Sequence, residues 1–320
     1  MSESYHYNYV FYNVDSISEI FLSRLRNLEN VKIPPSNFLT NFAIPNNHFL
    51  RRRTFHKMYD ASTFCNKSPI CFVFLGGLYA IKNNGYVEYI KARDKRNKVV
   101  FMLQDIMARK LLRPDMQNFD LLRPKTDLIT TYDEGDARKY GFTYMPEVFY
   151  ESLGKVTEPT HFDVDLLFLG HRKERLNFLL DIARHLSSLG VRCDFTITGV
   201  DEADRVQIEG VTYADEHVPY ADYIARIQRS RCILEIAQAG SVAPTLRTSE
   251  AIVYHRKLLT NRGISPEANF LPDSQIKEIT SIDTIDVGFL RANNNYCEFL
   301  EVDWKQEDRL AVFERCFQEG

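Results

Sequence analysis

The chain has 320 residues, of which 44% are hydrophobic and 26% are charged, and its formal net charge is −3. This length corresponds to about two domains, and the composition is that of a folded protein with sizeable cores. The charge excludes a nucleic-acid binder driven by electrostatics, because such a domain would be clearly basic.

The N-terminal sequence MSESYHYNYVFYN lacks the basic and apolar regions of a secretory signal. No stretch approaches the roughly 20 apolar residues that a membrane span requires. The six cysteines are scattered, with no C-x-x-C pair and no His-rich neighbourhood. We therefore expect a cytoplasmic protein with reduced thiols and no metal site.

The first half of the chain alternates short apolar strands with amphipathic helices, which is typical of a parallel α/β domain. A capping box formed by Ser16 and Glu19 predicts a helix start. Residues 151–163 carry Gly, Pro and polar residues without periodicity and are the predicted linker. Strands are predicted over 9–14, 31–33, 70–75, 99–103 and 128–131, and a further helix over 86–95.

The second half repeats the pattern more regularly and predicts a doubly wound domain. Gly170 is expected to end its first strand, Gly190 to cap its first helix, and Gly199 to form a turn. Strands are predicted over 165–169, 194–198, around 211, and over 232–236 and 258–260. Helices are predicted over 173–189 and 220–227 and from about 245. The last segment, 304–317, also looks helical.

Polar residues directly after strands are the first candidates for function, because ligands of open α/β sheets bind beyond the carboxyl ends of the strands. Gly170 and His171 follow one strand, with Arg172 and Arg175 close behind, and Thr198 and Gly199 end the next. A glycine turn at a helix N-terminus suits a phosphate, and the arginines would add charge. A plain strand-to-helix turn with solvated basic residues is an equally good interpretation.

A small-residue loop, QAGSVAP, precedes Thr245 and leads into a helix that carries Arg247 and Glu250. Positions i and i+3 share a helix face, so a cation and a carboxylate lie together there. Arginine pairs bidentately with a diphosphate, and a carboxylate accepts hydrogen bonds from vicinal ribose hydroxyls. The spacing alone slightly favours a plain intrahelical ion pair.

Two runs, DLLFLGHRKERLNFLLDIARHL and ILEIAQAGSVAPTLRTSEAIVYHRKLLTN, resemble the carboxy-terminal half of GT-B glycosyltransferases. Within that group they are similar to bacterial enzymes that build lipopolysaccharide and capsular polysaccharide. Those enzymes carry a "T-x-R-x-x-E-A" helix start followed by a "K-L-[IL]-T-[NT]" strand. The matching residues are Thr245, Arg247, Glu250, Ala251 and 257–261.

The resemblance implies two Rossmann-like doubly wound α/β domains facing a cleft. The acceptor-side domain would cover residues 1–155 and the donor-side domain 163–302, with 303–320 forming a helix that packs back on the first domain. The donor is then a nucleotide-diphosphate sugar, with no cofactor and no obligatory metal. By motif match, Glu250 contacts the donor ribose and Arg247 the diphosphate. One departure is Ala243-Pro244, where the family has more glycine, so backbone contact from this loop to phosphate is in doubt.

Three features of the first half are candidates on the acceptor side. Asp105 follows a predicted strand, where it is placed either to act as a general base or to cap the next helix. Gly76 and Gly77 either let a substrate approach the backbone or form a tight turn. The Arg51-Arg52-Arg53 run either meets anionic lipid or a lipid-diphosphate acceptor, or is a solvated face.

The resemblance implies a glycosyltransferase that uses a nucleotide-sugar donor and a glycan or lipid-linked acceptor in surface polysaccharide biosynthesis. Such an enzyme would be cytoplasmic, with peripheral contact to the inner face of the membrane, and would not act on nucleic acid. Two alternatives stay open: a non-catalytic nucleotide-binding partner subunit with a GT-B-like fold, and a GT-B sugar-nucleotide epimerase.

Overall fold

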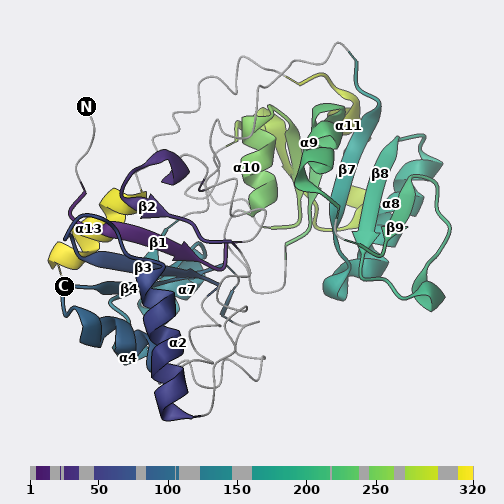
Figure 1. The fold of residues 1–320 in the computed structure, drawn as a ribbon. Helices are drawn as coiled ribbons and strands as arrows, with labels where there is room; N and C mark the ends of the chain where they lie inside the picture. The colour runs from purple at the N-terminus through teal and green to yellow at the C-terminus, as the bar shows by residue number, and fades with distance from the viewer. Residues whose placement is uncertain are drawn as a thin grey trace. The chain divides into compact units, whose positions relative to one another are not determined.

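The computed structural model describes residues 5–14, 22, 25–35, 47–76, 84–104, 106–107, 123–145, 161–216, 218–237, 245–262, 271–294 and 309–319. The chain divides into two compact units, here called unit 1 (Met1–Pro146 with Lys305–Gly320) and unit 2 (Glu147–Trp304). In the part of the chain that the structure describes, no helix has the length and apolar character needed to cross a membrane. Both units are drawn in Figure 1.

Unit 1 is built on a six-stranded sheet in which all pairs are parallel, in the order β2-β1-β3-β4-β5-β6. The five strands predicted from the sequence are confirmed to within about two residues, and β6 is an addition. The strands are β1 Asn8–Tyr12, β2 Val31–Lys32, β3 Ile70–Leu75, β4 Lys98–Leu103, β5 Leu128–Thr131 and β6 Thr143–Tyr144.

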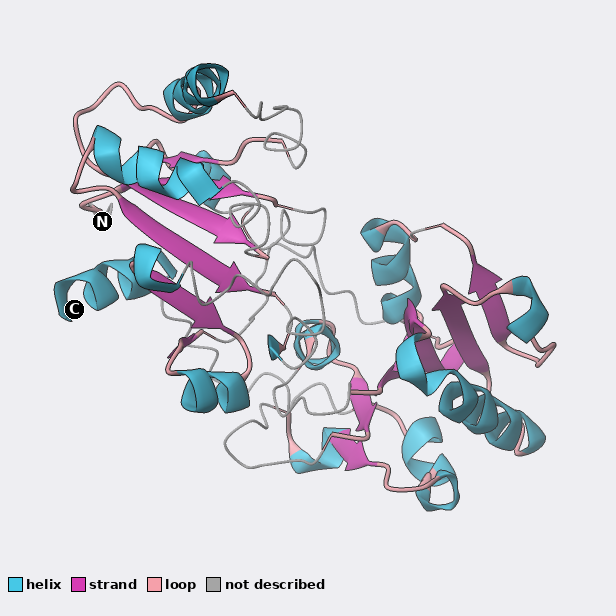
Figure 2. Ribbon diagram, turned by 90° about the horizontal axis from the view of Figure 1, so that it is seen from below, coloured by secondary structure: helices cyan, strands magenta, loops and turns pink. Residues whose placement is uncertain are grey.

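Helices cover both faces of this sheet, so its strands are apolar on both sides (Figure 2). Val10 and Tyr12 of β1 join a core with α2 and α4, whereas Tyr9 and Phe11 join a second core with α13. The helix predicted over 86–95 is confirmed, and the helical C-terminal segment belongs to unit 1. The helices are α2 His48–Asp60, α4 Asn84–Arg93, α7 Glu134–Tyr140 and α13 Arg309–Glu319.

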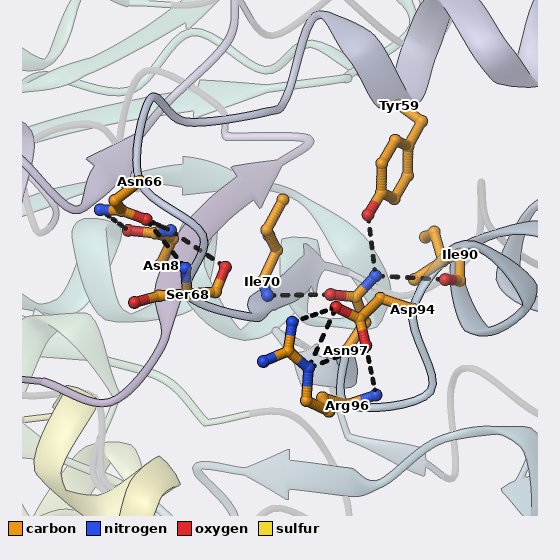
Figure 3. Close-up of polar contacts among 9 residues, drawn as sticks. All are labelled: Asn8, Tyr59, Asn66, Ser68, Ile70, Ile90, Asp94, Arg96 and Asn97. Atoms are coloured by element: carbon orange, nitrogen blue, oxygen red, sulfur yellow. Dashed lines mark hydrogen bonds and ion pairs between the residues drawn. The ribbon is translucent and has the colours of Figure 1, made fainter.

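Asparagine side chains tie the amino ends of the unit 1 strands together (Figure 3). Asn8 and Asn66 exchange side-chain hydrogen bonds of 2.5 and 3.1 Å. The amide of Asn97 accepts from the backbone N–H of Ile70 at 2.9 Å and donates to the Tyr59 hydroxyl at 3.0 Å. These contacts satisfy buried polar groups at the edge of the sheet opposite the carboxyl ends.

Unit 2 is also a six-stranded parallel sheet, in the order β12-β11-β10-β7-β8-β9. Taken from β9, this is the 3-2-1-4-5-6 order of a Rossmann fold, and the order reverses between β7 and β10. The predicted doubly wound domain is thereby confirmed. The strands are β7 Val164–His171, β8 Cys193–Thr198, β9 Val211–Ala214, β10 Ser230–Glu235, β11 Lys257–Thr260 and β12 Ile276–Glu278.

The helices of unit 2 also pack on its sheet. Leu179, Leu186 and Leu290, from α8 and α11, share one core with Phe168 of β7 and Leu234 of β10. Gly190 follows α8 in the left-handed region, with φ +68°, as predicted for a cap. The helices are α8 Leu176–Ser188, α9 Tyr220–Gln228, α10 Leu246–Val253 and α11 Val287–Arg291. Short 3-10 helices are Leu25–Asn27, Arg123–Lys125, Lys173–Arg175, Glu202–Asp204, Asp273–Gln275 and Ile282–Thr284.

One expectation about the strands and turns of unit 2 is wrong, and two expectations about the fold lie outside the described residues. Gly170 does not end its strand: β7 continues through Gly170 to His171, which pairs with Thr198 of β8. The chain turns two residues later, where Lys173 has a φ of +42°. The helix start at Ser16 and most of the predicted linker, 151–160, are not described.

Candidate functional site

The candidate site lies where the strand order of unit 2 reverses. We call this the β7–β10 junction: the carboxyl ends of β7 (Leu169–His171) and β10 (Glu235 and Ile236), which are neighbours in the sheet. Parallel strands direct their carboxyl ends to one edge, and a reversal of strand order leaves room for a ligand there. Two arginine side chains from different segments, Arg175 and Arg247, bind backbone carbonyls at this junction.

Arg175 reaches the junction from the start of α8. Its guanidinium donates to the carbonyl of Ile236 at the end of β10 and, at 3.3 Å, to the carbonyl of His171. It also lies over the Phe168 ring, 5.1 Å from the centroid. A Cβ on Gly170 would lie 3.2 Å from the Arg175 Nη2 atom, so the glycine makes room for this side chain inside a strand rather than at a turn.

Arg247 reaches the junction from α10. Thr245 is the N-cap of this helix, and its hydroxyl accepts from the Arg247 backbone N–H at 3.1 Å. The Arg247 side chain donates to the carbonyl of Leu169 at 2.5 Å and lies over the Tyr223 ring at 4.6 Å. Burial lowers the pKa of Arg247, but the neighbouring Glu250 carboxylate and Tyr223 outweigh this and raise it, so the cation is retained.

The Glu250 carboxylate is fully buried one turn further along α10. Its Oε1 atom accepts from the Tyr220 hydroxyl at 2.9 Å. Its Oε2 atom accepts from the Tyr223 hydroxyl at 3.1 Å and from Arg247 Nη1 at 2.8 Å. Burial raises the pKa of Glu250, and Arg247 and the two hydroxyls oppose that rise. The helical pairing of Arg247 with Glu250 predicted from the sequence is present. The predicted ribose contact of Glu250 stays a prediction.

A second buried carboxylate, Glu235, fixes the start of α10 to the sheet. Its Oε1 atom accepts from the Thr245 hydroxyl at 2.6 Å, the Thr245 backbone N–H at 3.2 Å and the Thr248 hydroxyl at 2.9 Å. Its Oε2 atom accepts from the Thr260 hydroxyl at 2.7 Å and faces Arg262 at 3.4 Å. Glu235 therefore links β10, β11 and the N-cap of the helix that carries Arg247.

The turn after β8 packs directly on the end of β7. Gly199 has a φ of +71°, and a Cβ there would lie 2.2 Å from Nε2 of His171. His171 Nδ1 accepts from the Lys173 backbone N–H at 3.1 Å, and the Thr198 carbonyl accepts from the Arg172 N–H at 2.9 Å. The left-handed conformation of this turn thus favours glycine at position 199, and a side chain there would also displace the exposed His171 imidazole.

Not every predicted donor residue points to the junction. The guanidinium of Arg172 pairs instead with Asp204, on the connection after β8, at 2.9 Å. Residues 238–244, which include Ala243-Pro244, lie outside the described residues. The structure therefore brings together Arg175, Arg247 and Glu250. Thr245 is the N-cap of the helix that carries Arg247 and Glu250.

In unit 1, Gly76 directly follows β3 with a φ of +71°, and its N–H donates to the Met102 carbonyl at 2.8 Å. A left-handed φ is one that glycine adopts readily, and both the tight turn and the approach of a substrate to this backbone stay predictions. Gly77 and Asp105 lie outside the described residues. A buried carboxylate that sequence reasoning did not single out, Asp136 of α7, accepts from the Met107 backbone N–H at 2.6 Å.

Chemically, the β7–β10 junction offers two arginine side chains held by backbone carbonyls and aromatic faces. Arginine keeps its charge at every physiological pH and presents a fork that matches phosphate oxygens. Such an arrangement binds an anion with two phosphate groups better than a neutral sugar.

A comparison with models of known protein families finds no match, and neither does a comparison with curated proteins. Solved structures do match. An α-glucosyltransferase with UDP and a 13-mer DNA containing an HMU base has a TM-score of 0.54 at 11% identity, over 97% of this chain and 92% of that one. Another α-glucosyltransferase structure, with UDP and DNA containing an A:G mismatch, has a TM-score of 0.52 at 9% identity, over 97% and 89%.

A third similar structure is an α,α-trehalose-phosphate synthase (UDP-forming) from Burkholderia xenovorans in complex with glucose-6-phosphate. Its TM-score is 0.51 at 11% identity, over 96% of this chain and 82% of that one. At such identities the likeness concerns the fold. The fold is the α/β, two-unit Rossmann-like fold of GT-B type that the sequence predicts.

Proposed function

We propose that this chain is a glycosyltransferase that takes its sugar from a nucleotide-diphosphate donor held at the β7–β10 junction of unit 2. The observation that carries the proposal is the meeting of Arg175 and Arg247 at this junction, from the two sides of the strand-order reversal. The similar structures named above include UDP complexes, which supports a nucleotide ligand for the fold.

Bond cleavage in such a reaction leaves negative charge on the departing diphosphate. Arginines that are already fixed by carbonyls stabilise this charge without the cost of reorganising during the reaction. In this proposal the arginines serve where other transferases use a metal ion, and no cofactor takes part. Gly170, His171, Thr198 and Gly199 would shape the neighbouring backbone around the donor.

The acceptor we propose is a glycan or a lipid-linked sugar of a surface polysaccharide, bound at unit 1 near Gly76 and Gly77. Asp105 is the proposed general base if the reaction inverts the anomeric centre. The net charge of −3 argues against a nucleic-acid acceptor.

A peripheral contact with an anionic membrane surface would bring the enzyme to such an acceptor, and α2 supports this. Its first turn exposes Phe49 and Leu50, with 75% and 47% of their surfaces accessible. Arg52 and Arg53 follow directly and are exposed. An exposed aromatic and aliphatic pair beside arginines suits the interface of an anionic bilayer.

The test is a panel of nucleotide sugars screened for thermal stabilisation of the full chain, followed by assays of nucleotide release with and without acceptor. We expect one nucleotide class to bind, and Arg175→Gln and Arg247→Gln each to weaken it about tenfold or more. Arg192→Gln is the matched control, because Arg192 precedes β8 at the opposite edge of the same sheet and pairs with Asp165.

The outcomes separate the candidate functions. Donor binding with acceptor-dependent nucleotide release supports the transferase. Binding without turnover on any acceptor indicates a non-catalytic partner, and conversion of the donor without acceptor indicates an epimerase. A chain that binds no nucleotide sugar contradicts the proposal.

A further inference from the structure

Beside the β7–β10 junction lies a buried polar cluster of three residues, Glu250, Tyr220 and Tyr223, which we call the Glu250 seat. Tyr220 and Tyr223 come from α9, and Glu250 comes from α10. We infer that the Glu250 seat positions Arg247 to meet the donor diphosphate, which makes Tyr220 and Tyr223 positioning residues for the reaction. This inference rests on the proposed function and deepens it.

The Arg247 guanidinium is constrained at several points. Nη1 is held by Glu250 at 2.8 Å, and Nη2 is held by the Leu169 carbonyl at 2.5 Å. One face of the group lies on the Tyr223 ring, 4.6 Å from the centroid. Two ends and one face of a planar cation are therefore fixed before any ligand arrives. Only 19% of the Arg247 side chain remains exposed, and it is held at the carboxyl end of β7.

The two tyrosines complete the hydrogen bonding of the Glu250 carboxylate. A buried carboxylate with one arginine partner would leave oxygen lone pairs unsatisfied, which is costly in a low-dielectric interior. Tyr220 donates to one oxygen and Tyr223 to the other, so both oxygens of Glu250 are engaged. Tyr223 acts twice, because its hydroxyl holds Glu250 while its ring carries Arg247.

The same contacts bear on the ribose assignment. Vicinal ribose hydroxyls would donate one hydrogen bond to each oxygen of Glu250, and the tyrosine hydroxyls make this pattern of bonds already. A ribose would have to displace both of them from a fully buried carboxylate. The seat therefore favours an action of Glu250 through Arg247 on the diphosphate over direct contact with the nucleoside.

The test uses a ligand that carries the diphosphate and no ribose. Inorganic pyrophosphate is titrated as a competitor of the nucleoside diphosphate that binds the full-length chain most tightly, and both dissociation constants are measured by calorimetry. We expect Tyr223→Phe to weaken both ligands by a common factor of about 3–10, the effect of losing one preorganised arginine contact. Tyr220→Phe and Glu250→Gln should act in the same direction. Tyr223→Phe carries the test if Glu250→Gln does not fold.

Tyr213→Phe is the matched control. Tyr213 lies in the same unit, and among the described residues its hydroxyl bonds only the backbone of Val206, at 2.8 and 2.9 Å. This variant should leave both dissociation constants within about twofold. If the variants of the Glu250 seat weaken binding of the nucleoside diphosphate but not of pyrophosphate, the inference is overturned and Glu250 is assigned to the ribose.

Unchanged binding of both ligands in the seat variants would also overturn it, as would a wild-type chain from which pyrophosphate displaces no nucleotide. A wild-type chain that binds no nucleoside diphosphate contradicts the proposed function instead. The failure of the seat and the failure of the function are therefore distinguishable.

Discussion

Replacing Glu235 by alanine tests how the candidate site is held on its sheet. The carboxylate is buried and engages Thr245, Thr248, Thr260 and Arg262. Removing one partner of a buried ion pair costs about 3–5 kcal/mol. We take this figure rather than a sum over the separate hydrogen bonds, because they share one carboxylate and are not additive.

For a domain of about 150 residues, each kcal/mol shifts the melting temperature by about 2–4 °C. Glu235→Ala should therefore lower the melting temperature of unit 2 by roughly 6–20 °C. The shift is measured by calorimetry on the full chain, and hydrogen exchange should assign the loss to peptides that cover α10 and β11. Glu278→Ala is the control, because Glu278 also ends a strand of this sheet but is exposed. A loss below about 1 kcal/mol for Glu235→Ala would refute the reasoning.

Three further predictions concern other parts of the chain. Gly199→Ala should destabilise unit 2 by roughly 1–2 kcal/mol, the cost of a left-handed alanine and about the cost expected for Gly190→Ala. The His171 imidazole that a Cβ would meet at 2.2 Å is exposed and can turn aside. An unchanged melting temperature would contradict this. Arg192 holds the pKa of Asp165 below its usual 3.8 against the effect of burial. As the pH falls below 3.8, the unfolded chain binds more protons than the folded chain, so the ion pair's contribution to the free energy of unfolding is lost. Asp165→Asn should therefore make the free energy of unfolding less dependent on pH in this range, as measured by acid unfolding curves. In a vesicle sedimentation assay, Phe49→Ala should weaken binding to phosphatidylglycerol vesicles about tenfold and should not change binding to neutral vesicles. Equal sedimentation of the wild-type chain with anionic and with neutral vesicles would count against the membrane contact.

The architecture of both units is predictable from the sequence because it depends on local patterns. The strands of both sheets are short apolar runs, and a parallel sheet covered by helices needs such runs. The helix α2 was not predicted, because three consecutive arginines interrupt its apolar face. Only Phe55, Met58 and Tyr59 of this helix are buried, so the apolar periodicity that would indicate a helix covers little more than one turn. Its N-cap, Asn47, is the one local feature that marks its start.

The candidate site is less predictable because it depends on tertiary contacts. Arg247 and Glu250 share a helix turn, and their spacing predicts the pair. The tyrosines of the Glu250 seat look like ordinary core residues of α9, and a buried tyrosine hydroxyl requires a partner without identifying it. Gly170 resembles a turn in sequence, but its function inside β7 is to admit the Arg175 side chain, which only the packed structure shows.

The central claim, that a nucleotide-sugar donor binds at the β7–β10 junction, is tested most directly by hydrogen exchange of the full chain with and without that donor. A bound ligand slows local opening of the backbone that it contacts. The account predicts slower exchange at the end of β7 with the start of α8, and at the start of α10. Donor binding that leaves these segments unchanged and protects only unit 1 would contradict it.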